Sequence, residues 1–182
     1  LAATLQAFAE LCQERGDSKQ AQTFREQARA YRDAIETEAW DGDWYLRAFY
    51  DDGTPLGSHE NRECRIDAIA QSWAVLSGLG EAERIQQAMT AVEKLLINEE
   101  DRLLLLFAPP FDKTDKDPGY IKGYLPGIRE NGGQYTHAAA WLGLAHARLG
   151  DGDRAYEIFD LINPVRRTAD SAGADLYRAE PY

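Results

Sequence analysis

Three side chains in one glycine-rich stretch have the chemistry to bind a sugar and an anion. Tyr124, Glu130 and His137 lie close together in the sequence and lead into a predicted helix. A carboxylate such as that of Glu130 accepts hydrogen bonds from neighbouring hydroxyl groups, and the face of an aromatic ring such as that of Tyr124 packs against the C–H side of a sugar ring. The first N–H groups of a helix favour anions, and a histidine in the first turn adds a further donor. The stretch therefore predicts a carbohydrate site beside an anion site.

The residues around these three also have plainer explanations. The pair Gly132–Gly133 has no Cβ atoms, which we interpret as room for the backbone to approach a ligand. Asn131, however, is a typical N-cap residue, and His137 would then form a hydrogen bond within the protein. Glu130 could equally pair with Arg129 at the surface, an interaction worth under ~1 kcal/mol. Both interpretations remain open at the level of sequence.

The other candidate clusters favour structural roles. The aromatic residues that follow the second predicted helix are typical of a core beneath a hairpin: Trp40, Trp44, Tyr45 and Tyr50. A calcium-like spacing is interrupted by lysines and followed by proline, so it favours a solvated loop and no metal site: Asp112, Asp115 and Asp117. The sequence contains no Ser-His-Asp order, no phosphate-cradling glycine loop and no His-Glu-x-x-His motif. The histidines outside the glycine-rich stretch are isolated in the sequence: His59 and His146.

The composition excludes several classes of partner. The chain has 182 residues, with 20 lysines and arginines against 31 aspartates and glutamates, and a formal net charge of -11. This acid excess argues against binding to nucleic acid or to an anionic membrane surface, both of which need clustered basic residues. The two cysteines, Cys12 and Cys64, do not make a disulfide scaffold. We therefore expect a reduced, cytoplasmic protein.

Apolar spacing and glycine stop signals predict three antiparallel helical hairpins. Each has a turn in which a glycine precedes an acidic residue, namely Gly16-Asp17, Gly80-Glu81 and Gly150-Asp151. The recurrence is longer than the ~34 residues of a tetratricopeptide repeat, which favours a closed ring of hairpins over a uniform solenoid. Pro164 is expected to close the last helix. Because helical spacing already begins at Leu1, we expect the chain to be a piece of a larger protein.

Two long insertions separate the hairpins. Residues 39–54 contain two Asp-Gly steps and β-type residues, and they predict a small β-hairpin. Residues 98–134 contain one short apolar strand at 103–107 and are otherwise rich in Asp, Lys, Gly and Pro. Loops of this length are often functional, so we expect the insertions to gather at one rim and to carry the site.

Several motifs resemble those of glycoside hydrolase family 94. They include ECRID at 63–67, QSWAVLSG at 71–78, PPFD at 109–112, DPGYIKGY at 117–124 and ENGGQYTHA at 130–138. The resemblance covers nearly the whole chain and looks strongest to the phosphorylase-like C-terminal part of cyclic β-1,2-glucan synthase. It implies an all-α fold in which three helical hairpins over residues 1–182 form roughly half of an (α/α)6 barrel.

The resemblance also implies roles for the residues singled out above. Tyr124 and Glu130 match positions that hold the acceptor sugar, and His137 matches a phosphate ligand. The implied reaction is inverting phosphorolysis of a β-glucan, with inorganic phosphate as co-substrate and no other cofactor. In such a reaction one carboxylic acid protonates the glycosidic oxygen while phosphate attacks the anomeric carbon from the opposite face.

One part of the family pattern is missing from this sequence. The general-acid aspartate of the family lies in an Asp-Trp-Asn-Asp-like segment, which does not occur between Leu1 and Tyr182. We therefore expect the general acid upstream of Leu1, in the remainder of the parent chain, and an inactive polypeptide when residues 1–182 are isolated. An open apolar seam predicts a homodimer of such a piece. In a cyclic glucan synthase the location would be the cytoplasmic face of the inner membrane.

Two other functional classes are compatible with helical hairpins. An α-helical interaction scaffold of the tetratricopeptide type would line a concave groove evenly with all hairpins. A glycosidase or epimerase on the same barrel would need a pair of suitably spaced carboxylates, and no obvious pair is present. The position of Glu130 and His137 in the structure distinguishes an enzyme site from a scaffold.

Overall fold

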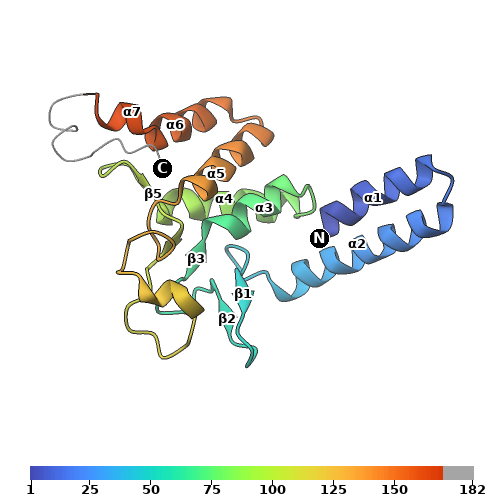
Figure 1. Ribbon diagram of the computed structural model, residues 1–182, viewed down its shortest axis with the longest axis horizontal. Coiled ribbons are helices and arrows are strands. Elements are labelled where there is room, and N and C mark those ends of the chain that lie inside the picture. Colours follow the sequence, from blue (N-terminus) through green and yellow to red (C-terminus); the bar gives the residue numbers. More distant parts are fainter. Residues whose placement is uncertain (170–182) are drawn as a thin grey trace.

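Helices dominate the computed structural model, which describes residues 1–169 (Figure 1). Within these residues the helices are α1 (Ala2–Glu14), α2 (Ser18–Glu38), α3 (Ala68–Leu76), α4 (Ala82–Leu95), α5 (Thr136–Arg148), α6 (Gly152–Ile162) and α7 (Pro164–Arg167), with a 3-10 helix at Gly119–Gly123. Helix α3 packs against both α4 and α5, and α5 packs against α6. The predicted mostly helical fold is confirmed, with three hairpins at α1–α2, α3–α4 and α5–α6.

The first and third hairpin turns form as their sequences predict. Gly16 and Gly150 take the left-handed backbone conformation that ends a helix, with φ of 81° and 85°. The side chain of Asp17 then accepts a hydrogen bond from a first-turn backbone N–H of α2 at 3.0 Å. Asp151 does the same for α6 at 3.1 Å. Each turn thus satisfies both helix ends that it joins.

The turn between α3 and α4 departs from the prediction. Its left-handed residue is Gly78, with φ of 68°, rather than Gly80. A Cβ atom on Gly80 would lie 3.0 Å from the side chain of Ile85, so this glycine serves the packing of Ile85. Glu81 occupies the N-cap position of α4 without a side-chain hydrogen bond to the helix.

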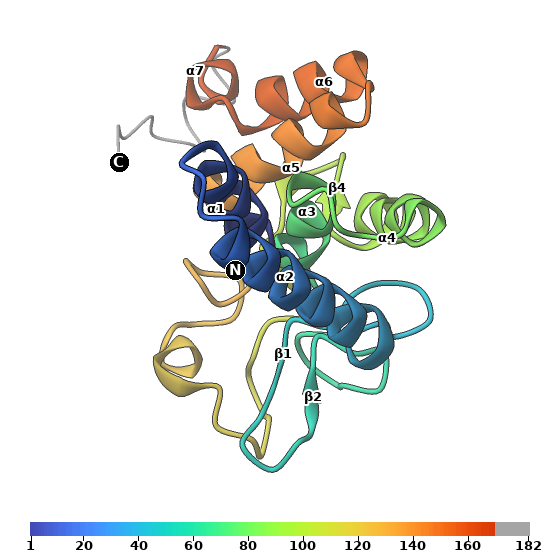
Figure 2. The same ribbon diagram turned by 90° about the vertical axis from the view of Figure 1, so that its right-hand side faces the viewer.

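The α1–α2 hairpin projects away from the other helices, as both ribbon views show (Figures 1 and 2). Its two helices approach closely because small residues lie between them, and Ala9, Ala21 and Ala28 are buried. Phe8 and Phe24 meet edge to face, with ring centroids 6.4 Å apart. The hairpin therefore carries its own small apolar interface.

The main apolar core lies among α3, α4, α5, α6 and the short strands. Its largest fully buried side chains are Ile66, Val92, Leu96, Leu104, Leu142 and Ile158. Trp44 and Tyr45 are buried in this same core, as the sequence predicts for aromatic residues beneath a hairpin. A second cluster beneath the long loop contains Cys64, Leu106, Phe107, Phe111 and Ala138.

Three small antiparallel sheets connect the helices. They pair β1 (Ala48–Phe49) with β2 (Pro55–Leu56), β3 (Ile66–Asp67) with β6 (Phe107–Ala108), and β4 (Ile97–Asn98) with β5 (Leu103–Leu104). The single strand predicted at 103–107 is therefore two strands that pair with different partners. The β3–β6 pair joins the long loop to the start of α3, where the Asp67 side chain caps the helix by accepting from Ile69 N–H at 2.7 Å.

Two further sequence predictions need correction. The small β-hairpin predicted within residues 39–54 forms only around the second Asp-Gly step, where β1 pairs with β2 and the hairpin ends at Leu56. The first Asp-Gly step lies inside an isolated bridge between Trp40 and Tyr45. Pro164 does not simply end the last helix. It begins α7, because proline fits the first helical position, where no N–H partner is needed, and Asn163 caps the new helix.

The β1–β2 hairpin and the loop through residues 109–135 lie at one end of the molecule in both ribbon views (Figures 1 and 2). Lys116 joins them: its Nζ donates to Thr54 Oγ1 at 3.0 Å, pairs with Asp52, and lies 5.7 Å from the ring centroid of Tyr50. This end forms the rim that carries the candidate site.

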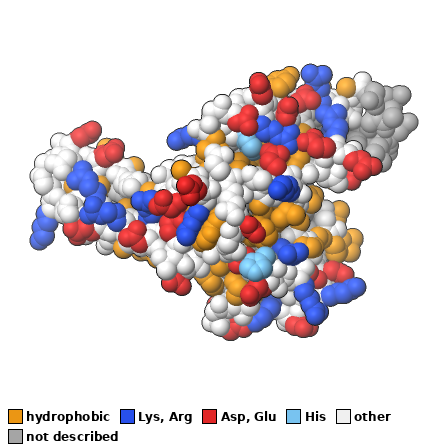
Figure 3. Space-filling view, turned by 180° about the vertical axis from the view of Figure 1, so that it is seen from behind, with side chains coloured by type: hydrophobic (Ala, Val, Ile, Leu, Met, Phe, Trp, Pro, Cys, Tyr) orange, Lys and Arg blue, Asp and Glu red, His pale blue; other side chains and the backbone are white. Residues whose placement is uncertain are grey.

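Charged side chains of both signs cover the projecting hairpin, and hydrophobic side chains gather more densely on the larger part of the molecule (Figure 3). None of the helices in residues 1–169 has the length and apolar character needed to cross a membrane.

Candidate functional site

Asn131 organises the glycine-rich loop from within. Its side chain is fully buried, and Oδ1 accepts a hydrogen bond from Phe111 N–H at 2.7 Å. Its Nδ2 donates to the carbonyl oxygens of Phe111 and Tyr124, each at 2.8 Å. Asn131 therefore does not cap α5, as one interpretation of the sequence held. It ties the backbone of Tyr124 to the start of the 111–118 loop.

The pair Gly132–Gly133 packs against the protein's own backbone. A Cβ atom on Gly132, where φ is 78°, would lie 2.9 Å from the Phe107 carbonyl oxygen. A Cβ atom on Gly133 would lie 2.8 Å from the carbonyl oxygen of Gly127. The close approach expected of these glycines is thus an approach to neighbouring loop segments, which fixes the loop that carries Glu130.

The ring of Tyr124 is half-buried and has neighbours on two sides. The guanidinium of Arg129 lies over it, 5.6 Å from the ring centroid. Tyr120 meets it edge to face, with centroids 6.2 Å apart. These contacts hold the ring in place, because a cation over one face and an edge-on ring restrict its rotation.

The carboxylate of Glu130 has an unsatisfied oxygen. The side chain is half-buried, and within residues 1–169 its Oε2 is shielded from solvent without a hydrogen-bond partner. The Arg129–Glu130 ion pair considered from the sequence is not formed, since Arg129 lies over Tyr124 instead. A buried acceptor without a donor costs about 1–3 kcal/mol, so Glu130 is poised to accept a hydrogen bond from a ligand.

Helix α5 begins without a side-chain cap. Tyr135 occupies the N-cap position, and its carbonyl oxygen accepts the first intrahelical bond, from Ala139 N–H at 3.0 Å. No side chain in the described part of the chain accepts from the first-turn N–H groups. The positive end of the helix dipole is therefore open to an anion.

His137 lies in this first turn with an exposed side chain. Its imidazole packs on the indole of Trp141, one turn further along α5, with ring centroids 4.0 Å apart. Tyr135 lies on its other flank at 6.4 Å. An exposed imidazole is consistent with a ligand role and argues against the internal hydrogen bond considered from the sequence.

Gln134 anchors the residues that precede α5. Its Oε1 accepts from the backbone N–H of Leu104 at 3.1 Å and from Arg167 Nη2 at 3.0 Å. The helix start is thereby fixed to β5 and to α7. Sequence reasoning missed this residue, because its partners lie far away along the chain.

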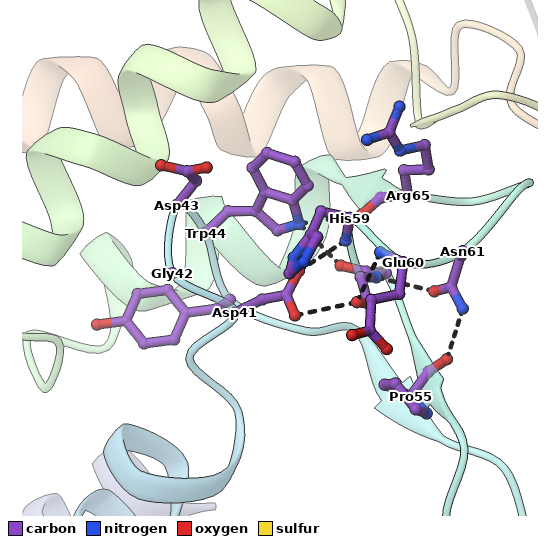
Figure 4. A network of polar contacts seen from close by, with 12 residues as sticks. Asp41, Gly42, Asp43, Trp44, Pro55, His59, Glu60, Asn61 and Arg65 are labelled. Atoms are coloured by element: carbon purple, nitrogen blue, oxygen red, sulfur yellow. Dashed lines mark hydrogen bonds and ion pairs between the residues drawn. The ribbon is translucent and has the colours of Figure 1, made fainter.

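A second polar network lies at the loop before β3 (Figure 4). Asp41 Oδ2 lies 2.7 Å from Nδ1 of His59 and accepts from the His59 backbone N–H at 2.6 Å, and Asp41 Oδ1 accepts from Ser58 Oγ at 3.0 Å. The hydrogen bond to Asp41 raises the pKa of His59. Because Ser58 donates to the aspartate and not to the histidine, the three residues form no nucleophilic triad. The network holds the loop around Ser58 and His59 against the segment that carries Asp41.

A third network joins α4, α5 and α6. Arg154 donates from Nε and Nη2 to the carboxylate of Glu93, with the Nε bonds at 3.0 and 3.1 Å. The Nε2 atom of the buried His146 lies 3.1 Å from Glu93 Oε1. Burial favours the neutral form of Glu93, but the nearby His146 and the hydrogen bonds from Arg154 outweigh it and lower the pKa of Glu93 to about 2. The sequence indicated no partner for His59 or His146. In the structure His59 pairs with Asp41 and His146 lies against Glu93.

No group of acidic, histidine or cysteine side chains within residues 1–169 is arranged to hold a metal ion. The three aspartates of the 112–117 segment are spread along the loop. Asp117 accepts from the N–H of Gly119 at 2.9 Å and so forms a local turn.

The whole chain matches one family model. The glycosyl hydrolase 94 superfamily, catalytic domain, is matched by residues 1–182. The chain belongs to this superfamily. The family resemblance drawn from the loop and helix motifs is therefore confirmed.

Among glycosyl hydrolase 94 relatives, the chain is 50% identical over 182 residues to "Cyclic beta-(1,2)-glucan synthase NdvB" of Rhizobium meliloti (strain 1021), which covers 100% of the chain and 6% of that protein. It is 36% identical over 165 residues to "N,N'-diacetylchitobiose phosphorylase" of Vibrio proteolyticus, covering 90% of the chain and 20% of that protein. It is also 36% identical over 163 residues to "Solabiose phosphorylase" of Paenibacillus borealis, covering 88% and 21%. The chain thus spans a small part of the length of each relative.

Proposed function

We propose that this glycosyl hydrolase 94 chain supplies the acceptor-sugar and phosphate contacts of an inverting phosphorylase-type reaction on a β-glucan. In this proposal Tyr124 and Glu130 hold the sugar, and His137 with the start of α5 holds inorganic phosphate. Support comes from glucan synthase and phosphorylase relatives in one family. The phosphorylase relatives support inorganic phosphate as co-substrate.

One observation carries the sugar assignment: the buried, unpartnered Oε2 of Glu130. A sugar hydroxyl is a neutral donor that fits a carboxylate oxygen, and neighbouring hydroxyls can pair with both oxygens of one carboxylate. The ring of Tyr124, held by Arg129 and Tyr120, offers an apolar surface from the same loop. Because Asn131 fixes the backbone of Tyr124, this surface is prepared before the sugar arrives.

The phosphate assignment depends on the uncapped start of α5. Phosphate carries its own negative charge, so it needs donors that outweigh repulsion from nearby acids. The first-turn N–H groups of α5 and the exposed imidazole of His137 are such donors. An attacking phosphate is already a nucleophile, so the second carboxylate with which an inverting hydrolase activates water is unnecessary.

The fold implied by this function is an (α/α)6 barrel, of which the three hairpins form roughly half. The β1–β2 hairpin and residues 109–135, which are parts of the two loops between hairpins, lie at one end of the described structure, where such a barrel would carry its site (Figures 1 and 2). The general acid that protonates the glycosidic oxygen would come from the remainder of the parent chain. We therefore propose that residues 1–182 alone do not turn over substrate.

The proposal is tested in the full-length protein by phosphorolysis of a β-1,2-linked glucan oligosaccharide with inorganic phosphate. Inversion is followed by the anomeric configuration of the sugar phosphate formed. Glu130→Gln is expected to raise the KM for the acceptor sugar in the synthetic direction about fivefold to tenfold, because the hydrogen bond to a charged carboxylate becomes a weaker one to a neutral amide. His137→Gln is expected to raise the KM for phosphate instead.

The matched control is Glu100→Gln, which changes an exposed glutamate in the turn between β4 and β5. It is expected to leave both KM values unchanged. If Glu130→Gln and Glu100→Gln behave alike, the sugar role of Glu130 is wrong. If the purified chain of residues 1–182 converts the same substrate, the proposed division of the catalytic groups is wrong.

A further inference from the structure

Three rings form a continuous row across α5 and α3. The imidazole of His137 lies 4.0 Å from Trp141 between centroids, with the planes inclined by 55°. The indole of Trp141 lies 5.2 Å from that of Trp73 on α3, nearly perpendicular at 82°. Helices α3 and α5 pack against each other, so the row joins the first turn of α5 to the middle of a neighbouring helix.

This row does not belong to the apolar core. Trp73 is 43% exposed, Trp141 is half-buried, and neither contributes to the two buried clusters. Their contact with His137 is therefore not a by-product of filling the interior. Because residues four positions apart lie on the same helix face, Trp141 faces His137 directly.

The face of an indole carries negative electrostatic potential and attracts a cation. Within residues 1–169, no hydrogen bond or ion pair with a side chain holds the His137 imidazole, and its ring neighbours are Trp141 and Tyr135. Trp141 makes the closer contact, and its own orientation is held edge-on by Trp73.

We propose that Trp141 is a positioning residue for phosphate: its indole holds and electrostatically supports the His137 imidazole in the first turn of α5, and Trp73 fixes the indole. This inference rests on the proposed function, since it assumes that His137 binds phosphate. Trp141 itself does not touch the substrate. Its contribution passes through His137 and therefore affects the phosphate step alone.

The test measures KM for phosphate, KM for the glucan and kcat in the full-length protein. Trp141→Leu is expected to raise the KM for phosphate about three- to tenfold, because the ring contact that orients the His137 imidazole is lost. The KM for the glucan is expected to stay unchanged. Trp141→Phe keeps an aromatic face and is expected to restore most of the phosphate affinity. Tyr156→Leu, which removes an exposed ring from α6, is the matched control and is expected to change none of the three constants.

A double-mutant cycle separates this inference from the proposed function. If Trp141 acts through His137, Trp141→Leu adds no further loss of phosphate affinity in a His137→Gln background. If His137→Gln raises the KM for phosphate while Trp141→Leu does not, or if the two effects add, the positioning role is wrong and the proposed function stands. If His137→Gln leaves the KM for phosphate unchanged, His137 does not bind phosphate, and both the phosphate part of the proposed function and this inference are wrong. Should Trp141→Leu not fold, Trp73→Leu is expected to give a smaller rise in the same constant, and no rise would overturn the inference.

Discussion

Asn131 and Phe111 hold each other through a closed pair of hydrogen bonds. The amide oxygen of Asn131 accepts from the backbone N–H of Phe111 at 2.7 Å, and its amide nitrogen donates to the backbone carbonyl of the same residue at 2.8 Å. The same nitrogen also donates to the carbonyl of Tyr124. The buried side chain of Asn131 thus forms hydrogen bonds with the backbone of two loop segments, at Phe111 and at Tyr124. These bonds fix the loop that carries the candidate sugar site.

Replacing this amide is expected to destabilise the loop. Asn131→Ala leaves a buried N–H and two carbonyl groups without partners, so the free energy of unfolding should fall by about 2–4 kcal/mol. Urea denaturation measures the change. Asn98→Ala, which removes a half-buried asparagine bonded to Asp101, is the control and should cost less than about 1 kcal/mol. Equal losses in the two variants would contradict the role given to Asn131.

A methyl group on Gly132 tests whether the loop packs as tightly as described. Gly132→Ala meets both a left-handed backbone conformation and the Phe107 carbonyl oxygen, whereas Gly127→Ala meets only the conformation, with φ of 80° and no atom within 4 Å. We expect Gly132→Ala to lower the free energy of unfolding by ~1–3 kcal/mol more than Gly127→Ala does. The melting temperature of Gly132→Ala should therefore be clearly lower than that of Gly127→Ala. Similar melting temperatures would show that the loop can open around this position.

The Glu93–Arg154 network predicts loss of stability in acid. Glu93 has a pKa of about 2 in the folded protein against an ordinary value of 4.5. A carboxyl with a lowered folded-state pKa stabilises the protein fully above its unfolded pKa, and this contribution is lost as the pH falls from about 4.5 to 2. Since the side chain is partly open to solvent, we expect a loss of about 1–2 kcal/mol.

Urea titrations at several pH values test the assignment to this residue. In Glu93→Gln the slope of stability against pH between 4.5 and 2 should become smaller, with reduced stability at neutral pH. Glu83→Gln, on the exposed side of the same helix, should retain the original slope. An unchanged slope in Glu93→Gln would mean that other carboxyl groups account for acid unfolding.

Exposed apolar residues predict self-association of the isolated chain. Large side chains on four helices are open to solvent, among them Phe8, Leu11, Ile35, Trp73 and Leu144. An apolar surface of this kind is normally covered by a partner, here a second copy of the chain. Light scattering at increasing protein concentration is expected to show a dimer. A monomer at all concentrations would contradict this prediction.

Local signals in the sequence were sufficient for the helical hairpins. A glycine that can take positive φ, followed by an acid that can cap the next helix, specifies a turn within a few residues, and Gly16–Asp17 and Gly150–Asp151 behave as expected. The α3–α4 turn has two candidate glycines, and the packing of Ile85 decides between them. That choice depends on tertiary contact and could not be predicted.

The sequence indicated which residue types could form a candidate site. It did not indicate the long-range contacts that hold those residues in place. Asn131 stands just before a helix, so its sequence position favours a cap, but its partner Phe111 lies 20 residues away. The partners of His59 and Gln134 are equally remote in the sequence. The His137–Trp141 contact is different, because a spacing of four residues on one helix is visible in the sequence and could have indicated it.

The projecting α1–α2 hairpin implies that the molecule does not open as one unit. Its interface consists mainly of alanines, and it is joined to the remainder through polar contacts such as Arg84 to Glu36 at 2.7 Å and Arg32 to the Leu79 carbonyl at 2.8 Å. Segments with so little buried apolar surface open at lower free energy than a packed core. Backbone amides of α1 should therefore exchange with deuterium well before those of α5. A single unfolding midpoint would then combine the opening of the α1–α2 hairpin with the unfolding of the core.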